Sequence, residues 1–310
     1  MTTATAQATP SRERPTSPWQ LALRRLLRHR SGLVGGGIIV FLLLVALFAP
    51  VIAPYDPNEV LLGKEPGIRR RQKPCIHLLG CPPEQPQHIM GLDGNARDVF
   101  SRVIYGTRVS LFVGFTTVTV AIVAGTVLGA VAGYVGGWVD NIIMRFMDVL
   151  LAFPSLLLAI AIVTVLGRGL QNALLAIAIV STPVYARVVR ASVLSLKERE
   201  FVLAARALGA GHLLILFKHI LPNALPPLIV QATLGIATAI LDAAALSFLG
   251  LGAQPPTPEW GSMLGEERNQ VFTAPHLVFF PGLAIMITVL AFNLLGDALR
   301  DALDPRLHRE

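Results

Sequence analysis

The chain has 310 residues, of which 53% are hydrophobic and 15% are charged, and its formal net charge is +7. Soluble proteins carry about 25% charged residues, so this composition excludes a cytosolic enzyme, a disordered chain and a secreted disulfide-rich scaffold. Charge is missing mainly from six apolar runs, each near or above the roughly 18–20 residues that cross a bilayer. These runs cover residues 31–55, 109–139, 149–167, 169–186, 219–241 and 269–296. Because only a helix satisfies the backbone of a lone span in lipid, the sequence predicts an all-α membrane protein with about six transmembrane helices.

The arginines of the N-terminal tail predict the topology. This tail, residues 1–31, has six arginines and one glutamate, and positive charge beside a span favours the cytoplasmic side. The apolar stretch that follows is too long for the core of a cleaved signal peptide, so an uncleaved first helix is favoured. The predicted division is a cytoplasmic tail 1–31, a first transmembrane helix 32–54, an extracytoplasmic loop 55–108, a five-helix core 109–296 and a cytoplasmic tail 297–310.

The predicted extracytoplasmic loop holds both cysteines, Cys75 and Cys81, in a segment bounded by prolines. Disulfides persist outside the cytoplasmic membrane, so a local disulfide is the favoured hypothesis. A metal site with His77 and His88 and a pair of free thiols stay open as alternatives; the metal site is disfavoured because closed sites usually have four ligands. The same loop runs against the positive-inside tendency, which long loops largely escape. Its basic residues are Lys64, Arg69, Arg70, Arg71 and Lys73.

The second and third spans carry packing signals. Small residues at every fourth position predict a close helix contact in the second span, and they are Gly125, Gly129 and Gly133. At the start of the third span, Arg145 and Asp148 are three residues apart and predict an ion pair on one helix face. Pro154 is expected to kink the helix that contains it.

A polar segment, residues 195–222, separates the fourth and fifth spans and has the pattern of two short helices. Apolar side chains at i, i+3, i+4 and i+7 form one face of the first helix, and they are Phe201, Ala204, Ala205 and Leu208. Gly209 and Gly211 are expected to supply the turn with positive φ, and Pro222 is expected to stop the second helix. The residues alone leave two interpretations open, a docking surface for a cytoplasmic partner and a loop on the bilayer interface.

Asp242 is the most deeply placed charged residue, late in the fifth span. Ionisable residues in spans usually face the bundle interior or a water-filled cavity. Asp242 is therefore either a polar lock bonded to neighbouring helices or a pathway residue that meets a peptide amino terminus. The residues favour the lock and leave the pathway role open.

Motifs of catalysis do not occur in the sequence. There is no G-x-x-x-x-G-K-[ST] phosphate loop, no H-E-x-x-H zinc helix and no G-x-S-x-G nucleophile elbow. We therefore expect no catalytic residue, no metal site and no cofactor in this chain.

Several motifs in a fixed order carry a family resemblance. Ala204-Ala205 with Gly209, followed by Leu221-Pro222, resembles the E-A-A…G…I-x-L-P loop of bacterial ABC importer permeases. The fuller strings at 200–210 and 219–223 resemble the C-type subunit of the dipeptide, oligopeptide and nickel branch. Further blocks that match this branch lie at 91–111, 148–154, 246–252 and 258–264.

The block at 91–111 is similar to the family's G-T-D-x-x-G-R-D…S-R…Y-G-A-R-x-S-L motif. Its outer-loop motif residues are Asp93, Arg97, Asp98, Ser101 and Arg102. This chain departs from the family pattern at four places: Leu203 replaces the leading glutamate of E-A-A, Leu92 replaces a threonine, Ala96 replaces a glycine, and Asp242 stands where a glutamate is usual. The insertion 66–90 lies outside the common pattern.

The resemblance implies a type I ABC importer permease fold and a non-catalytic, multi-pass subunit of the bacterial cytoplasmic membrane with both termini cytoplasmic. The implied partners are a B-type permease subunit, two ABC ATPase subunits that bind ATP and Mg, an extracytoplasmic substrate-binding protein and membrane lipid, with no nucleic acid. The implied ATPase-coupling residues are Glu200, Ala204, Ala205, Arg206, Gly209 and Pro222. Dipeptides or oligopeptides are the expected solutes, with nickel chelates and other small solutes as alternatives. A secondary transporter, which would show inverted repeats, and a membrane scaffold are the rival functions.

Overall fold

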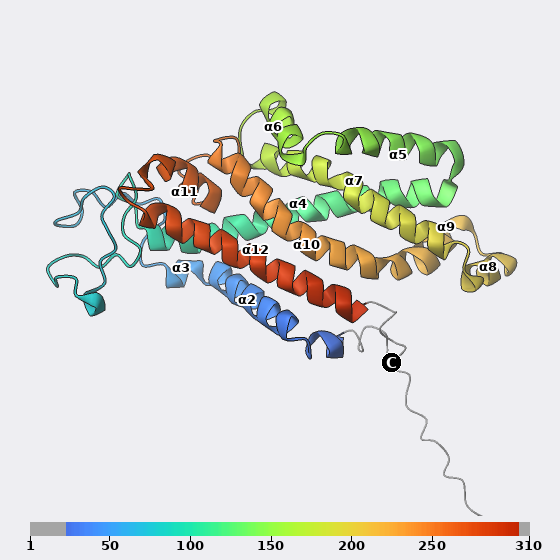
Figure 1. Ribbon diagram of the computed structural model, residues 1–310, viewed down its shortest axis with the longest axis horizontal. Helices are drawn as coiled ribbons and strands as arrows, with labels where there is room; N and C mark the ends of the chain where they lie inside the picture. The colour runs from blue at the N-terminus through green and yellow to red at the C-terminus, as the bar shows by residue number, and fades with distance from the viewer. Residues whose placement is uncertain (1–22, 304–310) are drawn as a thin grey trace, which may run out of the picture.

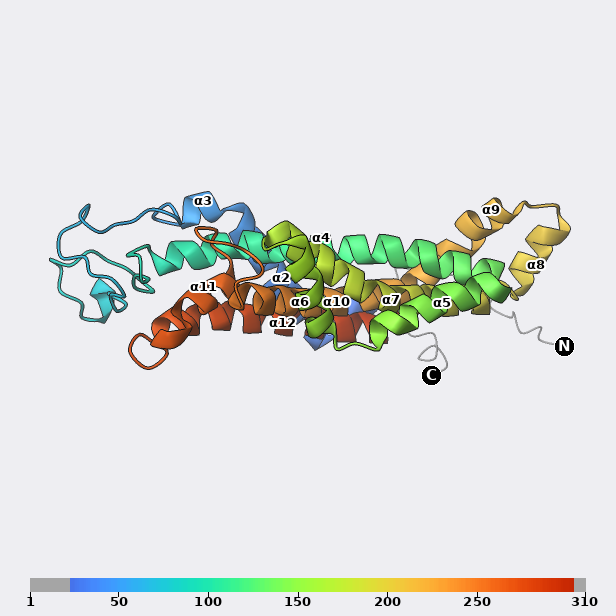
Figure 2. The same ribbon diagram turned by 90° about the horizontal axis from the view of Figure 1, so that it is seen from above.

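The computed structural model describes residues 23–303, and this part of the chain contains helices and no strand. The helices, in chain order, are α2 (Arg30–Leu47), α3 (Ala49–Ile52), η1 (His77–Leu79), α4 (Val99–Val135), α5 (Gly137–Leu151), α6 (Ser155–Leu166), α7 (Leu170–Leu196), α8 (Glu200–Ala207), α9 (His212–Leu214), the π-helical η2 (Ile215–Ile220), α10 (Leu221–Phe248), α11 (Trp260–Glu267), η3 (Arg268–Gln270) and α12 (His276–Leu303). Their arrangement is shown in Figures 1 and 2.

The expected all-α membrane protein with about six spans is confirmed. Within the described residues, five helical stretches are long and apolar enough to cross a membrane: α2, α4, α7, α9 through α10, and α12. The pair α5 and α6 counts as a sixth span, with a 93° bend at its break. Pro154 lies at this break as the residue before α6, and a proline cannot donate the hydrogen bond that would continue α5.

The core of the bundle lies where α4 packs along α7, with α10 against both. The glycines of α4 allow the close approach that their spacing predicts. A Cβ at Gly129 would collide with the backbone of Ala186, and one at Gly125 would collide with Tyr185. A Cβ at Gly133 would lie in tight contact, 3.0 Å from the carbonyl oxygen of Arg190. Close backbone approach through small residues is a common way to join helices in lipid, where apolar burial gives little driving force.

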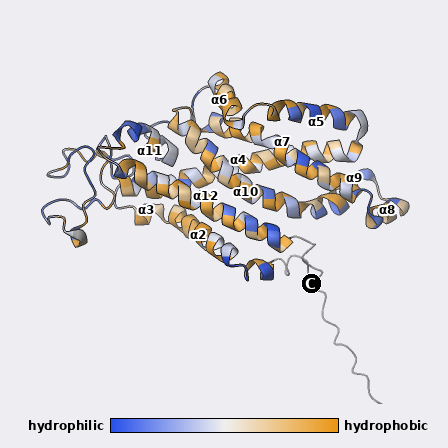
Figure 3. Cartoon of the chain, in the orientation of Figure 1, coloured by the Kyte–Doolittle hydropathy of each residue, from blue (hydrophilic) through white to orange (hydrophobic). Residues whose placement is uncertain are grey.

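The loops gather at two opposite ends of the bundle (Figures 1 and 2). We call the end formed by residues 53–98 and 249–275 the loop end, and the end formed by residues 197–220 the coupling end. The last turn of α12 and the first turn of α2 lie toward the coupling end. Hydrophobic residues dominate the helical body, whereas hydrophilic residues are frequent in α8, in α11 and in the loops (Figure 3).

Several predicted boundaries are wrong. The long loop ends at Asp98 instead of 108, because the Asp98 carboxylate accepts a hydrogen bond from the Ser101 N–H at 2.8 Å and so starts α4 at Val99. The first predicted helix, 32–54, is divided into α2 and α3. The predicted tail 297–310 begins inside α12, which continues to Leu303. The predicted structure of residues 1–22 and 304–310 lies outside the described residues.

Candidate functional site

The coupling end is built from a tight helical hairpin. Helix α8 ends at Ala207, and Gly209 follows with a φ of +82°, the left-handed conformation that favours glycine. Gly211 has a φ of −70°, so the expectation that it also takes a positive φ is wrong. Pro222 does not stop the second helix, because α9 continues through η2 into α10. It is the second residue of α10, which directly follows the π-helix η2.

Helix α8 presents an apolar surface at this end. Val202 is completely buried among core residues that include Ile215 of η2, and it fixes one side of the helix. On the exposed side lie Phe201, Ala204 and Leu208, with Leu208 90% exposed, and Ala205 is half-buried beneath them. We call this exposed side the α8 face. The predicted coupling residues Glu200 and Arg206 are also exposed. Exposed apolar groups clustered within a polar segment mark a contact surface for another protein or for the membrane.

Hydrogen bonds and ion pairs connect the coupling end to the spans. Tyr134 Oη lies 2.9 Å from His212 Nδ1, and Lys197 Nζ donates to the Gly133 carbonyl at 3.3 Å, so the end of α4 holds both sides of the hairpin. Helix α5 is bound to α7 by the Asp140–Arg190 and Asp148–Arg187 pairs, each with an N–O distance of 2.6 Å. The predicted Arg145–Asp148 pair is wrong, because Asp148 pairs across helices with Arg187. Displacement of the hairpin would therefore act directly on α4 and α7.

A polar stripe follows one side of α10. It consists of Asn223, Gln231, Thr238 and Asp242, which are separated by eight, seven and four residues and therefore share one helix side. All four are exposed or half-buried. Asp242 has no hydrogen bond or ion pair with any residue of the described chain, whereas a polar lock would need such bonds. Polar groups on the surface of a span avoid lipid and face water or another chain.

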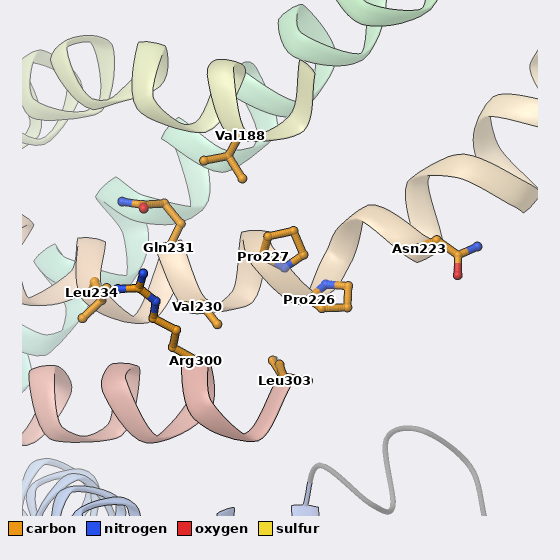
Figure 4. A pocket seen from close by; sticks show the side chains of 9 residues that line it. All are labelled: Val188, Asn223, Pro226, Pro227, Val230, Gln231, Leu234, Arg300 and Leu303. Carbon is orange, nitrogen blue, oxygen red and sulfur yellow. The ribbon is translucent and has the colours of Figure 1, made fainter. Parts of the chain in front are cut away.

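A hollow of about 770 Å³ opens beside Asn223 and Gln231, the two stripe residues nearest the coupling end (Figure 4). Its walls come from Val188 of α7, from residues 223–234 of α10, and from Arg300 and Leu303 of α12. Figure 4 shows the Gln231 amide and the Arg300 guanidinium on the same side of the hollow, near Leu234. Pro226 and Pro227 have no N–H to donate to the backbone carbonyls one turn earlier. Those carbonyls therefore stay available as hydrogen-bond acceptors. Sequence reasoning missed Gln231 and Arg300, although the spacing of Gln231 from Asp242 could have indicated it.

The predicted outer-loop motif forms a buried charged network at the loop end. Arg97 Nε donates to Asp93 Oδ2 at 2.6 Å, and Arg97 Nη2 donates to Glu266 of α11 at 2.6 Å. Arg102 donates to the carbonyls of Pro57 and Pro256 at 3.0 and 3.2 Å. All five motif residues are buried. The network therefore joins the long loop, the start of α4 and the segment before α11.

Residues that sequence reasoning missed complete this network. His88 is fully buried, with Nδ1 3.0 Å from Asp98 Oδ1 and Nε2 3.5 Å from Glu65 Oε2. Tyr55 packs on the His88 ring, and burial, followed by its hydrogen bond to Glu65, raises the pKa of Tyr55 to about 12. Their contacts join residues far apart in sequence, so no local pattern indicates them.

Glu259 begins α11 and accepts hydrogen bonds from the backbone N–H groups of Gly261 and Ser262. Burial raises its pKa, and these two hydrogen bonds oppose that rise. Ala96 has a φ of +59° at a position where the family has glycine. A left-handed conformation costs a residue with a Cβ more than glycine, so Ala96 adopts a conformation that the glycine of the family pattern would adopt more easily.

The two cysteines are joined as the Cys75–Cys81 disulfide, which encloses η1. Cys75 and His88 also exchange backbone hydrogen bonds of 2.8 and 3.0 Å, which close the base of this segment. Both thiols are used in the disulfide, so the alternative metal site formed with His77 and His88 is wrong.

Comparison with known proteins now identifies the architecture. Residues 125–309 match the family described as "Binding-protein-dependent transport system inner membrane component", and residues 17–74 match the "N-terminal TM domain of oligopeptide transport permease C". The chain belongs to the binding-protein-dependent transport system inner membrane component family. It is a multi-pass membrane permease subunit of an ABC importer, and the rival secondary-transporter and scaffold functions are not favoured.

Relatives support this membership over nearly the whole chain. The dipeptide transport system permease protein DppC of Alkalihalophilus pseudofirmus is 49% identical, covering 94% of this chain and 91% of the relative. The glutathione transport system permease protein GsiD of Salmonella typhimurium is 48% identical with the same coverage. An inward-facing structure of the MetNI methionine ABC transporter aligns with a TM-score of 0.54 at 21% identity, covering 66% of this chain and 96% of the aligned chain. That likeness shows the fold.

Proposed function

We propose that this permease forms half of the solute path of a peptide-class importer, with a B-type permease subunit forming the other half. Two relatives are named for dipeptide and glutathione transport, and both solutes are short peptides. Peptides are therefore the favoured substrate class, and nickel chelates and other small solutes are the alternative.

The exposed α8 face carries the proposal, because it gives a membrane permease an apolar docking surface at one end of its bundle. Two ABC ATPase subunits, which bind ATP and Mg, dock on the transporter, one at the coupling end of each permease half. In this chain the contact uses Glu200, Ala204, Ala205, Arg206 and Gly209, with Pro222 at the start of α10. ATP-driven closure then moves the hairpin, and α4 and α7 follow through the bonds of Tyr134 and Lys197. Rigid-body rocking of this kind needs no catalytic residue or cofactor in the permease.

The polar stripe of α10 lines the solute path in this proposal. Asp242 faces the loop-end half of the path, where it would attract the ammonium group of a peptide. Gln231 and Asn223 follow toward the coupling end, where the hollow widens. The absence of a bonded partner for Asp242 in the described chain supports the pathway role over the polar lock.

The proposed orientation places the coupling end and both termini in the cytoplasm of a bacterium. The loop end then faces the extracytoplasmic substrate-binding protein, and membrane lipid surrounds the bundle. The arginines of the N-terminal tail support this orientation. Nucleic acid has no role in the proposal, since the net positive charge is accounted for by topology.

Reconstitution in proteoliposomes tests the function. We expect the complex of this chain with a second permease, two ATPases and a binding protein to hydrolyse ATP faster when peptide-loaded binding protein is added, and to accumulate peptide in its lumen. The chain alone is expected to be inert. Transport by the chain alone, driven by an ion gradient, would show a secondary carrier and refute the proposal.

A further inference from the structure

The insertion 66–90 presents basic side chains that have no counter-charge. Arg69, Arg70 and Lys73 are exposed, and none of them forms an ion pair with a residue of the described chain. The basic residues beside them are paired, since Lys64 Nζ lies 2.7 Å from Glu59 and Arg71 Nε lies 3.0 Å from Glu267. We call Arg69, Arg70 and Lys73 the basic tip.

The basic tip is held on a fixed frame. Arg71 N–H donates to the Asp93 carbonyl and Leu92 N–H donates to the Gln72 carbonyl, both at 3.0 Å, so residues 71–72 are fixed to the segment that precedes α4. On the other side of Lys73, the Cys75–His88 backbone pair and the buried His88–Asp98 contact fix the chain to the start of α4. Charged groups on such a preorganised frame lose little conformational entropy when a partner binds.

A hollow adjoins the tip. It has a volume of about 470 Å³, and it is bounded by Arg70 and by residues from the stretches 58–60, 95–97 and 255–256. Arg97 in its wall is already neutralised by Asp93 and Glu266, whereas Arg70 is not. The Arg70 guanidinium and the side-chain amides of Asn58 and Asn95 offer hydrogen-bond donors to a carboxylate that enters the hollow.

The position of the tip favours a protein over a lipid surface. Residues 53–98 form the extreme loop end of the molecule and project beyond α3 and α11 (Figures 1 and 2). Anionic lipid headgroups would lie around the helical body, whereas a protein that docks on the loop end would meet the tip first. Charges at the rim of an interface increase the rate of association and select complementary partners.

We propose that the basic tip docks an acidic patch of the extracytoplasmic binding protein, with one carboxylate of that protein seated beside Arg70. This inference rests on the proposed function, because it needs a binding protein as the partner. It assigns the basic tip a role in selecting that partner.

The test uses the assembled transporter in nanodiscs and the binding protein that stimulates its ATP hydrolysis. We expect the triple variant Arg69→Glu/Arg70→Glu/Lys73→Glu to weaken binding of that protein about tenfold or more at low salt, with a much smaller difference at high salt. Basal ATP hydrolysis should stay unchanged. The single variants Arg70→Glu and Lys64→Glu are a matched pair, since both reverse one charge of the same loop, and Arg70→Glu should have the larger effect.

The outcomes separate the two proposals. If the wild-type complex is not stimulated by any candidate binding protein, the proposed function fails and this inference fails with it. If the wild type is stimulated and the triple variant binds equally well, the docking role alone is refuted. If the variant loses affinity for vesicles of anionic phosphatidylglycerol but keeps its affinity for the binding protein, the tip contacts lipid and the inference is also refuted. Should the triple variant not assemble, the comparison of Arg70→Glu with Lys64→Glu decides.

Discussion

Single residues set how closely the spans approach, and Gly129 is the clearest case. Its Cβ position is occupied by the backbone of Ala186 in α7, so no rotamer change can make room. The spacing of the α4 glycines was enough to predict a close contact from sequence. It could not identify α7 as the partner, because the helix that approaches is determined by the tertiary arrangement.

The substitution Gly129→Val should separate α4 from α7. Overpacking of a close contact costs about 1–3 kcal/mol, and here the neighbour is backbone. We expect a lower midpoint of thermal unfolding in detergent. The control is Gly282→Val in α12, where an added Cβ meets nothing within 4 Å. Equal midpoints for the two variants would contradict the packing argument.

Asp242 is predicted to act on the solute and to contribute little to folding. The substitution Asp242→Asn removes its charge and keeps its size, so a charge-assisted contact worth about 1.5–3 kcal/mol is weakened. Uptake of a peptide with a free amino terminus should fall about tenfold or more, with thermal stability unchanged. A polar lock would give the opposite result, a lower unfolding midpoint with proportionate loss of all activity.

At the scale of elements, proline has different consequences at different positions. Sequence reasoning predicted a kink at Pro154 and a stop at Pro222; the chain bends by 93° at the break beside Pro154, and Pro222 does not stop its helix. Both residues lack the N–H, but the helix continues past Pro222 into α10. The chain before it continues as the π-helix η2, a form that periodicity does not indicate.

The α8 face is predicted to hold the ATPase subunits. The substitution Leu208→Asp places a charge in an apolar contact, and burial of an unpaired charge is strongly unfavourable. The ATPase subunits should be lost when the complex is purified through a tag on this chain. Because Leu208 is 90% exposed, folding of the permease itself should be unaffected. Phe272→Asp, at an exposed apolar site of the loop end, should retain the ATPases, and equal retention in both variants would refute the assignment.

At the scale of the whole molecule, hydropathy predicts the spans, but the contacts at the loop end require the structure. Six uncharged runs correspond to five long helices and one bent pair, because each run must satisfy its backbone internally in lipid. The pairing of Arg97 with Glu266 joins residues 169 positions apart, and no local periodicity connects them. The motif residues could be identified by resemblance, whereas their burial and their partners could not.

The orientation of the whole bundle can be tested by cysteine labelling in intact cells. In a background with Cys75 and Cys81 replaced by Ser, Asn58→Cys provides a probe at the loop end and Glu198→Cys one at the coupling end, and both positions are exposed. The N-terminal arginines predict that the coupling end is cytoplasmic. A membrane-impermeant maleimide should therefore modify the probe at position 58 and leave the one at 198 unmodified until the membrane is permeabilised. Uptake assays of the same variants would confirm that each probe reports on assembled protein. The reverse labelling pattern would show that the basic residues of the insertion, rather than those of the tail, lie inside, and it would remove the basis for docking a binding protein at the loop end.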